Sequence, residues 1–458
     1  MNRRKPAMTD NSRRHFLDTL GAGALLALAP LTARAATVNR VVVVGGGMAG
    51  ATAAKYLRVW SNKTVDVTLV DTNTSYTSNI MSNLVVTGQY APTILAYTWA
   101  NLVKNYGVKL VNGGVTAVEP GGSLGPWKVI VTKGTTVTTL YCERVVLAPG
   151  VQFDPVPLTS DPAQAAPITH AWQAGAQTTL LRDRLAAIPA TGTFVMTIPK
   201  APYRCPPGPY ERACVVADWL KRNRPGARIV VLDANPYVMA ERENFENAFT
   251  MMYGANLTYL PSRVVKSVQA AAGAPGGTVT FDVVDPSGVP ITTEPIAADV
   301  LNVIPPHRAG AIVQTLGLAD SGGFAPVNGA TFESTVAGKA GIHVIGDASK
   351  TALPKAGHVG NQGAKICVDA ILRGFAGQLP YATPTANSAC YTPVNSTMAG
   401  WLTAIYQYQQ DPATGAWKYV AIDQVSAAVG ATEARGPSTD SFAKMNTWYR
   451  SLMTESFS

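Results

Sequence analysis

The chain has 458 residues, of which 47% are hydrophobic and 14% charged, a composition typical of a globular protein and not of a disordered one. No uncharged apolar run reaches the length of a membrane span. The formal net charge is +9, and residues 1–35 contribute +4 of it, with six Lys or Arg against two Asp. The remaining +5 is mildly basic, which is compatible with an acidic partner but gives no nucleic-acid signature.

The N-terminus has the pattern of a twin-arginine signal peptide. Arg13 and Arg14 precede His15-Phe16-Leu17, an apolar stretch covers residues 20–31, and Ala33-Arg34-Ala35 satisfies the small-x-small cleavage rule. We therefore expect a leader over residues 1–35 and a periplasmic protein exported in its folded state. The alternative is an ordinary basic N-terminus.

A glycine-rich turn follows the leader, between a predicted strand and a predicted helix. Residues 40–57 read RVVVVGGGMAGATAAKYL, and the next predicted strand, residues 65–71, ends in Asp71. The pattern fits G-x-G-x-x-G, in which the backbone approaches a pyrophosphate at a helix N-terminus and the acidic residue bonds a ribose hydroxyl. The motif glycines are Gly45, Gly47 and Gly50.

Two later strand ends favour a flavin dinucleotide. Residues 144–150 end in Ala148-Pro149-Gly150, and residues 341–349 contain Gly346-Asp347. Both are similar to the A-T-G and G-D stretches of the two-dinucleotide-fold flavoproteins, in which the Asp bonds the ribityl chain of FAD. The resemblance implies an α/β fold with two Rossmann-like domains, as in glutathione reductase. A plain strand-end turn is the alternative for Gly346-Asp347.

A second α/β unit lies in the middle of the chain. Residues 191–199 and 227–235 predict strands, and residues 207–225 predict the helix between them. The turn before this helix has no G-x-G-x-x-G, and its prolines supply no N–H for a phosphate. We therefore expect no NAD site here, although the unit is Rossmann-like.

The turn carries a cysteine instead, Cys205, which could be a structural thiol, a metal ligand or a redox group. The chain has five cysteines, an odd number, and neither Cys-x-x-Cys nor Cys-x-x-Cys-His. We expect neither a zinc-ribbon metal site nor covalent haem in this chain. Three of the cysteines are predicted to be buried as small hydrophobic residues: Cys142, Cys214 and Cys367.

The sequence around Cys205, PYRCPPGPYERA, resembles the flavoprotein subunit of flavocytochrome c sulfide dehydrogenase. Further matching stretches are residues 40–57, 170–185, 302–310, 331–349 and 447–457. The resemblance implies FAD domains at 36–165 and 300–380, a second Rossmann-like domain at 166–299, and a small α+β domain at 381–458. It covers essentially the whole chain after the leader.

The resemblance also implies roles for individual residues. Cys205 and Cys390, the latter in NSACYTP, would form a redox disulfide beside the flavin; a structural disulfide or two inert thiols are the alternatives. Glu211 would be an acid/base, with a solvated helix-end carboxylate as its alternative. Trp448 would close over the flavin, with ordinary packing as its alternative.

One departure from the family concerns the flavin linkage. The family commonly tethers FAD through a cysteine, and spacing between Asn73-Thr74 and Ser82-Asn83 puts Asn79 at that place. An asparagine forms no thioether, so we expect non-covalent FAD. Past residue 390, residues 401–410 and 416–422 predict a β-hairpin, and residues 441–453 predict a terminal helix.

The implied activity is oxidation of sulfide to sulfur or polysulfide, with electrons leaving FAD for a separate c-type cytochrome subunit, since no haem motif occurs in this chain. The alternatives are a sulfide:quinone oxidoreductase, a flavoprotein acting on another sulfur compound, and a non-catalytic flavin-binding electron-transfer module.

Overall fold

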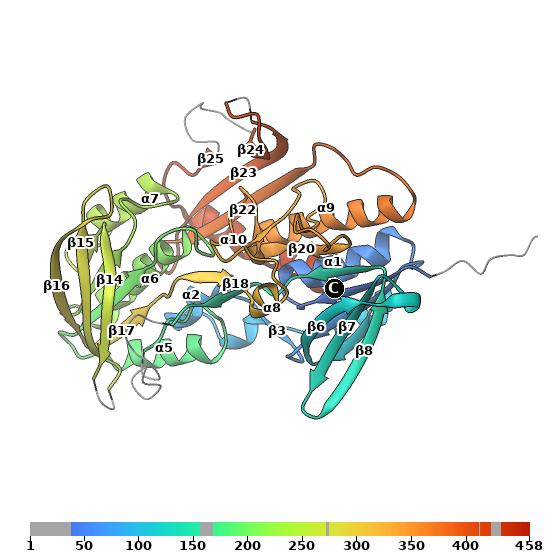
Figure 1. Ribbon diagram of the computed structural model, residues 1–458. Helices are drawn as coiled ribbons and strands as arrows, with labels where there is room; N and C mark the ends of the chain where they lie inside the picture. Colours follow the sequence, from blue (N-terminus) through green and yellow to red (C-terminus); the bar gives the residue numbers. More distant parts are fainter. Residues whose placement is uncertain (1–37, 156–167, 272–273, 412, 423–431) are drawn as a thin grey trace, which may run out of the picture. The chain divides into compact units, whose positions relative to one another are not determined.

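The computed structural model describes residues 38–155, 168–271, 274–411, 413–422 and 432–458 (Figure 1). Within this part of the chain, everything from Asn39 onward belongs to one compact unit. The predicted leader, residues 1–35, lies outside the described residues.

The first parallel sheet has the order β20-β9-β1-β2-β5, and its strands pair without an antiparallel member. Val41, Val42, Val43 and Val44 of β1 are all buried, which explains why a run of valines forms this central strand. The strands are β1 (Arg40–Val44), β2 (Asp66–Asp71), β5 (Lys109–Asn112), β9 (Arg144–Leu147) and β20 (Ile342–Val344).

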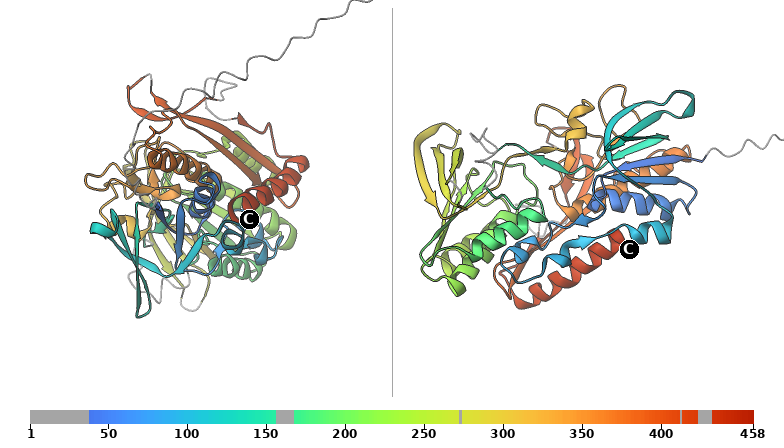
Figure 2. Two further views of the ribbon diagram at one scale, coloured as in Figure 1. Left: turned by 90° about the vertical axis from the view of Figure 1, so that its right-hand side faces the viewer. Right: turned by 90° about the horizontal axis from the view of Figure 1, so that it is seen from below.

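Helix α1 (Met48–Trp60) follows β1 directly and contacts both α9 (Gly357–Phe375) and α10 (Thr439–Phe457) (Figure 2). These contacts bring the end of the chain against its first helix. Smaller elements of this region are β3 (Tyr76–Thr77), α2 (Ser82–Val86), β4 (Ala96–Tyr97), α3 (Ala100–Tyr106), β6 (Gly114–Pro120), β7 (Trp127–Lys133), β8 (Thr136–Cys142), β10 (Val151–Phe153), β18 (His307–Ala309), α8 (Ala311–Thr315), β19 (Ala325–Pro326) and β21 (Ser349–Lys350).

The second parallel sheet, of order β13-β12-β11-β17, confirms the predicted middle α/β unit. Every residue of β11 is buried, as expected for a strand covered on both faces. The elements of this unit are α5 (Ala176–Ala186), β11 (Thr193–Ile198), α6 (Gly208–Asn223), β12 (Arg228–Asp233), α7 (Arg242–Asn247), β13 (Leu257–Leu260), β14 (Arg263–Ala270), β15 (Gly277–Val284), β16 (Pro290–Ala298) and β17 (Val300–Val303). The predicted fold class, two Rossmann-like α/β units, is therefore confirmed.

The C-terminal part is an antiparallel sheet followed by α10. Strands β23 (Ala399–Gln410) and β24 (Trp417–Ala421) form the predicted hairpin, and β22 (Thr385–Pro393) and β25 (Thr432–Glu433) both pair with β23. The Ser438 hydroxyl caps α10 by accepting from the Ser441 N–H.

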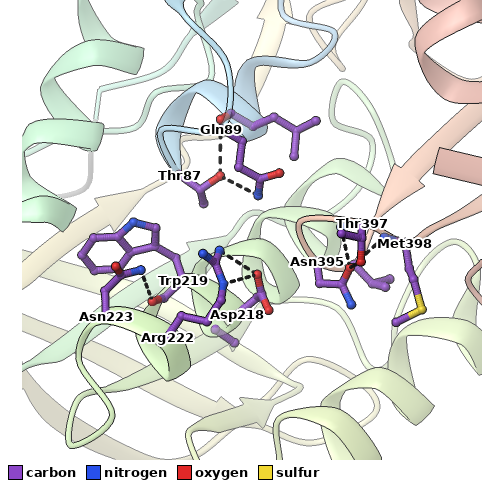
Figure 3. Close-up of polar contacts among 12 residues, drawn as sticks. Thr87, Gln89, Asp218, Trp219, Arg222, Asn223, Asn395, Thr397 and Met398 are labelled. Atoms are coloured by element: carbon purple, nitrogen blue, oxygen red, sulfur yellow. Dashed lines mark hydrogen bonds and ion pairs between the residues drawn. The ribbon is translucent and has the colours of Figure 1, made fainter. Parts of the chain in front are cut away.

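Strand β22 turns into β23 beside α6, as Figure 3 shows. The Asn395 side chain closes this turn, because its Oδ1 accepts the N–H groups of Thr397 and Met398 at 2.8 and 2.7 Å. The Tyr253 hydroxyl donates to the Val394 carbonyl at 2.7 Å and ties the turn to the second α/β unit. The register of β22 is thus fixed at the end nearest α6.

A buried arginine, Arg212 of α6, joins several of these segments. It is 1% exposed, and its guanidinium donates to the Asn83 and Asn302 side chains at 2.8 and 3.1 Å and to two backbone carbonyls. The carbonyls belong to His170 and Ala171. Its guanidinium carbon also lies 4.7 Å from the centroid of a Trp172 ring.

We predict that Arg212→Ala lowers the free energy of unfolding by about 3–5 kcal/mol. The substitution leaves several buried acceptors without a hydrogen-bond donor and leaves the neighbouring Glu211 carboxyl group without a cation. Urea unfolding followed by tryptophan fluorescence measures this. Arg222→Ala on the same helix is the matched control: its exposed ion pair with Asp218 is worth less than about 1 kcal/mol. Equal losses in the two variants would contradict the central role of Arg212.

Candidate functional site

A single cavity of about 690 Å³ gathers the residues that the sequence singles out. Its volume is in the range of small-molecule and cofactor sites. The sequence-predicted residues that line it are Gly45, Gly47, Asp71, Asn79, Ala148, Gly150, Cys205, Glu211, Gly346, Asp347, Cys390 and Trp448. Gly50 does not line the cavity; it packs beneath the turn.

At two of the motif positions a neighbouring backbone carbonyl comes so close that only glycine fits. A Cβ on Gly50 would lie 1.8 Å from the Gly45 carbonyl oxygen, and one on Gly45, whose φ is +97°, would lie 2.3 Å from that of Ala148. Helix α1 starts with Gly47 as its N-cap, and Met48 and Ala49 also line the cavity. Free N–H groups of a first helical turn therefore face the space, as a pyrophosphate needs.

Asp71 lies at the end of β2, against the same turn. Its Oδ2 accepts the Gly46 N–H and its Oδ1 accepts the Asn73 N–H, both at 2.7 Å. A carboxylate offers about four lone-pair sites, so Asp71 retains acceptor capacity toward the cavity. The geometry is compatible with the predicted ribose contact.

Asp347 follows β20 at the opposite side of the α1 N-terminus. Gly346 has φ +67°, and a Cβ there would lie 3.0 Å from the Ala49 side chain, so the turn passes close to α1. Burial raises the pKa of Asp347, whereas Arg204 and Lys355 act to lower it. The turn is thus a strand-end turn whose carboxyl group also lines the cavity.

The residues present fit a dinucleotide. A helix N-terminus offers N–H groups for the phosphates, Asp71 and Asp347 offer acceptors for hydroxyl groups, and aromatic rings such as Trp448 offer a surface for a planar ring system. Trp448 lies with its ring centroid 5.6 Å from that of Tyr391 and 6.2 Å from that of His358. It thus both packs and lines the cavity.

Cys205 and Cys390 reach the cavity from different elements. Cys205 sits in the turn before α6 with φ +59°, and its N–H donates to the Lys355 carbonyl at 2.7 Å; Cys390 lies on β22. Both are free thiols in the structure, so the predicted disulfide is not formed there. Burial raises the pKa of Cys205 to about 12, with help from Glu211.

Cys390 has its pKa raised well above the usual value, first by burial and next by Cys205. The effect of Cys205 on the pKa of Cys390 places the two thiols in one electrostatic environment. As separate thiols they resist ionisation, so a negative charge on either sulfur needs compensation nearby.

Glu211 is in the first turn of α6, as predicted, but it is 8% exposed. The alternative of a solvated carboxylate is therefore wrong. Asn83 holds it, with Nδ2 donating to Glu211 Oε1 at 2.8 Å while Oδ1 of the same amide accepts from Arg212. Burial raises the pKa of Glu211 to about 8, against the opposing effects of Asn83 and Arg212.

Asn79 lines the cavity, and its Oδ1 accepts the Ala174 N–H at 2.7 Å. The side chain at the position of the family's tethering cysteine therefore already binds a neighbouring loop. The remaining cysteines, Cys142, Cys214 and Cys367, are each 0% exposed, which confirms that they are buried.

Sequence reasoning missed other residues of the cavity wall. Asn83, Trp172, Arg204 and His358 all line it. From the sequence, Asn83 is noted only as a flank of the Asn79 segment. A polar side chain in the otherwise apolar run SNLVV is the signal that indicates a buried polar residue. Arg204 lies in the PYRCPPGPYERA stretch but was given no role there, and His358 lies outside every stretch singled out in the sequence.

Comparisons with known proteins agree with this geometry. Residues 178–305 match the family described as sulfide dehydrogenase (flavocytochrome c) flavoprotein chain, central, and residues 39–182 match the pyridine nucleotide-disulphide oxidoreductase family. The first match spans the second α/β unit and the second spans the glycine-rich turn.

Several solved structures share the fold at low identity. The sulfide:quinone oxidoreductase from the hyperthermophilic bacterium Aquifex aeolicus has a TM-score of 0.69 at 16% identity, covering 92% of this chain and 91% of that one. NDH2 from Plasmodium falciparum in complex with NADH has a TM-score of 0.63 at 10% identity, with 92% and 96% covered. A putidaredoxin reductase–putidaredoxin complex has a TM-score of 0.60 at 15% identity, with 91% and 93% covered.

These structures show the fold, and the two family matches carry the assignment. They confirm the resemblance inferred from the PYRCPPGPYERA stretch and support a flavin cofactor in the cavity. Residues 39–182 thus match the pyridine nucleotide-disulphide oxidoreductases and residues 178–305 match the central part of the flavocytochrome c sulfide dehydrogenase flavoprotein chain, and together these matches support a flavin-dependent oxidoreductase.

Proposed function

We propose that this protein is a periplasmic FAD-dependent sulfide dehydrogenase subunit. It oxidises sulfide to sulfur or polysulfide and passes the electrons through FAD to a c-type cytochrome subunit. The observation that carries the proposal is the meeting of Cys205, Cys390 and the buried Glu211 in the cavity that also holds the dinucleotide turn. The family match to a flavocytochrome c flavoprotein chain supports the substrate and the partner.

The first step uses Cys205 and Cys390 in their oxidised, disulfide-bonded form. The anion HS⁻ attacks one sulfur, a new S–S bond forms, and the cysteine S–S bond breaks. One cysteine then carries a persulfide, S–SH, and the other is a thiolate. Oxidation of HS⁻ to zero-valent sulfur releases two electrons and one proton in total.

Glu211 accepts the proton. In its ionised form the carboxylate opposes a thiolate at Cys205, since it helps to raise the pKa of that thiol. When Glu211 takes the persulfide proton it becomes neutral. The electrostatic repulsion between its carboxylate and the forming thiolate is then removed. Asn83 keeps the carboxyl group oriented by donating to it at 2.8 Å. Proton uptake and thiolate formation therefore support each other.

Bound FAD supplies an acceptor for the electron pair and a donor of single electrons to a haem. We propose that FAD binds non-covalently, because the family's tethering position is Asn79 here, and that NAD is not used. The start of α6, where an NAD phosphate would sit in related enzymes, presents Pro207, Pro209 and the buried Glu211. A carboxylate and missing N–H groups disfavour an anion there.

A sulfide:quinone oxidoreductase is the second candidate, favoured by the fold similarity to the Aquifex aeolicus enzyme. Among the described helices, none is both long and apolar enough to cross a lipid bilayer. The sulfide-reduced protein should reduce cytochrome c faster than a soluble quinone if it is a sulfide dehydrogenase subunit. The opposite order would favour a sulfide:quinone oxidoreductase. Faster reduction of the flavin by organic thiols than by sulfide would favour the third candidate, an enzyme acting on another sulfur compound.

We predict that Cys205→Ser abolishes reduction of the flavin by sulfide while FAD stays bound. Stopped-flow absorbance of the flavin band under anaerobic conditions measures the loss. Cys214→Ala, on the next turns of α6 and away from the cavity, is the control and should keep the wild-type rate constant. Unchanged reduction in the Cys205 variant would leave the protein as a flavin-binding module with a structural cysteine pair.

We predict that Glu211→Gln slows sulfide-driven flavin reduction about 100-fold, the usual contribution of a positioned base. The pKa of Glu211 is raised to about 8, so the carboxyl group is neutral below that pH and ionised above it. The wild-type rate constant, corrected for the fraction of HS⁻, should therefore rise as pH approaches about 8. The glutamine variant should lack this rise, whereas Asp218→Asn on the same helix should retain it.

We predict that acid precipitation releases the flavin into the supernatant, because Asn79 forms no covalent bond to it. Absorbance of the supernatant and mass spectrometry of the precipitated chain measure the partition. Flavin mass on the precipitated chain would show that another residue supplies a tether.

A further inference from the structure

A second buried carboxyl group, Glu241, lies behind the cysteine site. It is 1% exposed, and its Oε2 accepts a hydrogen bond from the Thr392 hydroxyl at 2.9 Å. Its other oxygen, Oε1, is buried without a hydrogen-bond partner. An unpaired buried carboxyl oxygen is costly, so its presence calls for a role.

The backbone is arranged to hold this group in place. Glu241 has φ +50°, an uncommon conformation for a residue with a side chain, and although it is the N-cap residue of α7 its side chain makes no capping hydrogen bond. Opposite Thr392 on β23 stands Gly400. A Cβ there would lie 2.8 Å from Glu241 Oε2 and 3.1 Å from Thr392 Oγ1, so the glycine leaves room for this hydrogen bond.

Thr392 connects Glu241 to the cysteine. Cys390 and Thr392 are two residues apart on β22, hence on the same face of the strand, and both line the flavin cavity. Thr392 is 1% exposed, so its hydroxyl is fixed between the cavity and the carboxyl group. Glu241 thus influences the pKa of Cys390, as Glu211 influences that of Cys205.

The charge of Glu241 is set by the groups around it. Burial, with help from the carboxylates of Glu433 on β25 and Glu211 on α6, raises its pKa to about 8 against the opposing effects of the Thr392 hydroxyl and the Asn244 amide. No cation is among these influences. The carboxyl group is therefore neutral at neutral pH and becomes ionised above about pH 8.

Ionised Glu241 acts electrostatically on two thiols. It helps to raise the pKa of Cys390 and of the buried Cys214. A negative charge at Glu241 therefore disfavours both an arriving anion and a departing thiolate at Cys390. This holds whichever of the two cysteines sulfide attacks.

We propose that Glu241, acting through Thr392, is the positioning residue that sets the charge of the Cys390 half of the site: neutral, it admits an anionic sulfur nucleophile, and ionised, it excludes one. The proposal rests on the proposed function for its biological meaning. The two carboxyl groups then have opposite requirements, because Glu211 acts when ionised and Glu241 permits reaction when neutral. Their combination gives a bell-shaped pH dependence with its falling limb due to Glu241.

The first experiment measures Cys390 itself and needs no sulfide. In the FAD-bound, thiol-reduced protein carrying Cys205→Ser, the rate of Cys390 alkylation by iodoacetamide is followed by peptide mass spectrometry between about pH 7 and 10, around the reference pKa of cysteine. We expect Glu241→Gln to lower the apparent pKa of Cys390 by about one unit, which is about tenfold faster alkylation at pH 9. Glu243→Gln, an exposed carboxylate two residues away, should change nothing.

A second variant guards against loss of folding. Thr392→Val removes the 2.9 Å hydrogen bond to Glu241 Oε2, so the carboxyl group stays neutral to higher pH and Cys390 alkylation should again become faster near pH 9. Equal alkylation rates in the Cys205→Ser protein and in the same protein carrying Glu241→Gln or Thr392→Val, including no reaction in any of them, would overturn the proposal.

The falling limb of sulfide-driven flavin reduction is the second readout. In Glu241→Gln it should move to higher pH while the rising limb assigned to Glu211 stays. If sulfide reduces the flavin in neither protein, the proposed function fails while the alkylation result still decides the role of Glu241. If sulfide reduces both proteins with identical falling limbs, the role of Glu241 fails and the proposed function stands.

Discussion

The guanidinium of Arg212 is the interaction on which the site depends. A buried guanidinium must satisfy its N–H donors within the protein, and Arg212 does so with Asn83, Asn302 and the carbonyls of residues 170 and 171. These partners belong to the segment of α2, the end of β17 and the loop before α5. Because the same helix turn carries Glu211, the arginine that joins these segments also fixes the carboxyl group that faces the cysteines.

The second theme is electrostatic. The cavity wall between α6 and β22 contains two thiols and the Glu211 carboxyl group, and Glu241 is hydrogen-bonded to Thr392 of the same wall. Burial opposes ionisation of all four groups. Such a region holds few negative charges at once, so the protonation of one group decides that of the next. Arg212 lies beside Glu211, and its own pKa is lowered by burial to about 9. The site therefore exchanges protons among its own groups more readily than it accumulates charge.

Sequence alone predicted the parts of this structure that follow from local rules. The valine run of β1, the spacing of the motif glycines, the β23–β24 hairpin and α10 all come from periodicity or backbone sterics. The short motif around Cys205 identified the family that the comparisons support. Residues such as Asn83 and Glu241 escaped prediction because their importance arises from burial. Glu241 precedes a six-residue helix in a stretch rich in charges, where a solvent-exposed side chain is the ordinary expectation.

The Asn79–Ala174 hydrogen bond shows what the asparagine does at the position where the family commonly has a tethering cysteine. The amide joins the loop after β3 to the loop before α5, two loops on the cavity wall that belong to different Rossmann-like units. A cysteine at this position would attach the cofactor to one loop, whereas asparagine attaches the loops to each other. Under the proposal of a non-covalent flavin, retention of the coenzyme would then depend on both loops together, because the hydrogen bond that joins them replaces a covalent attachment to one of them.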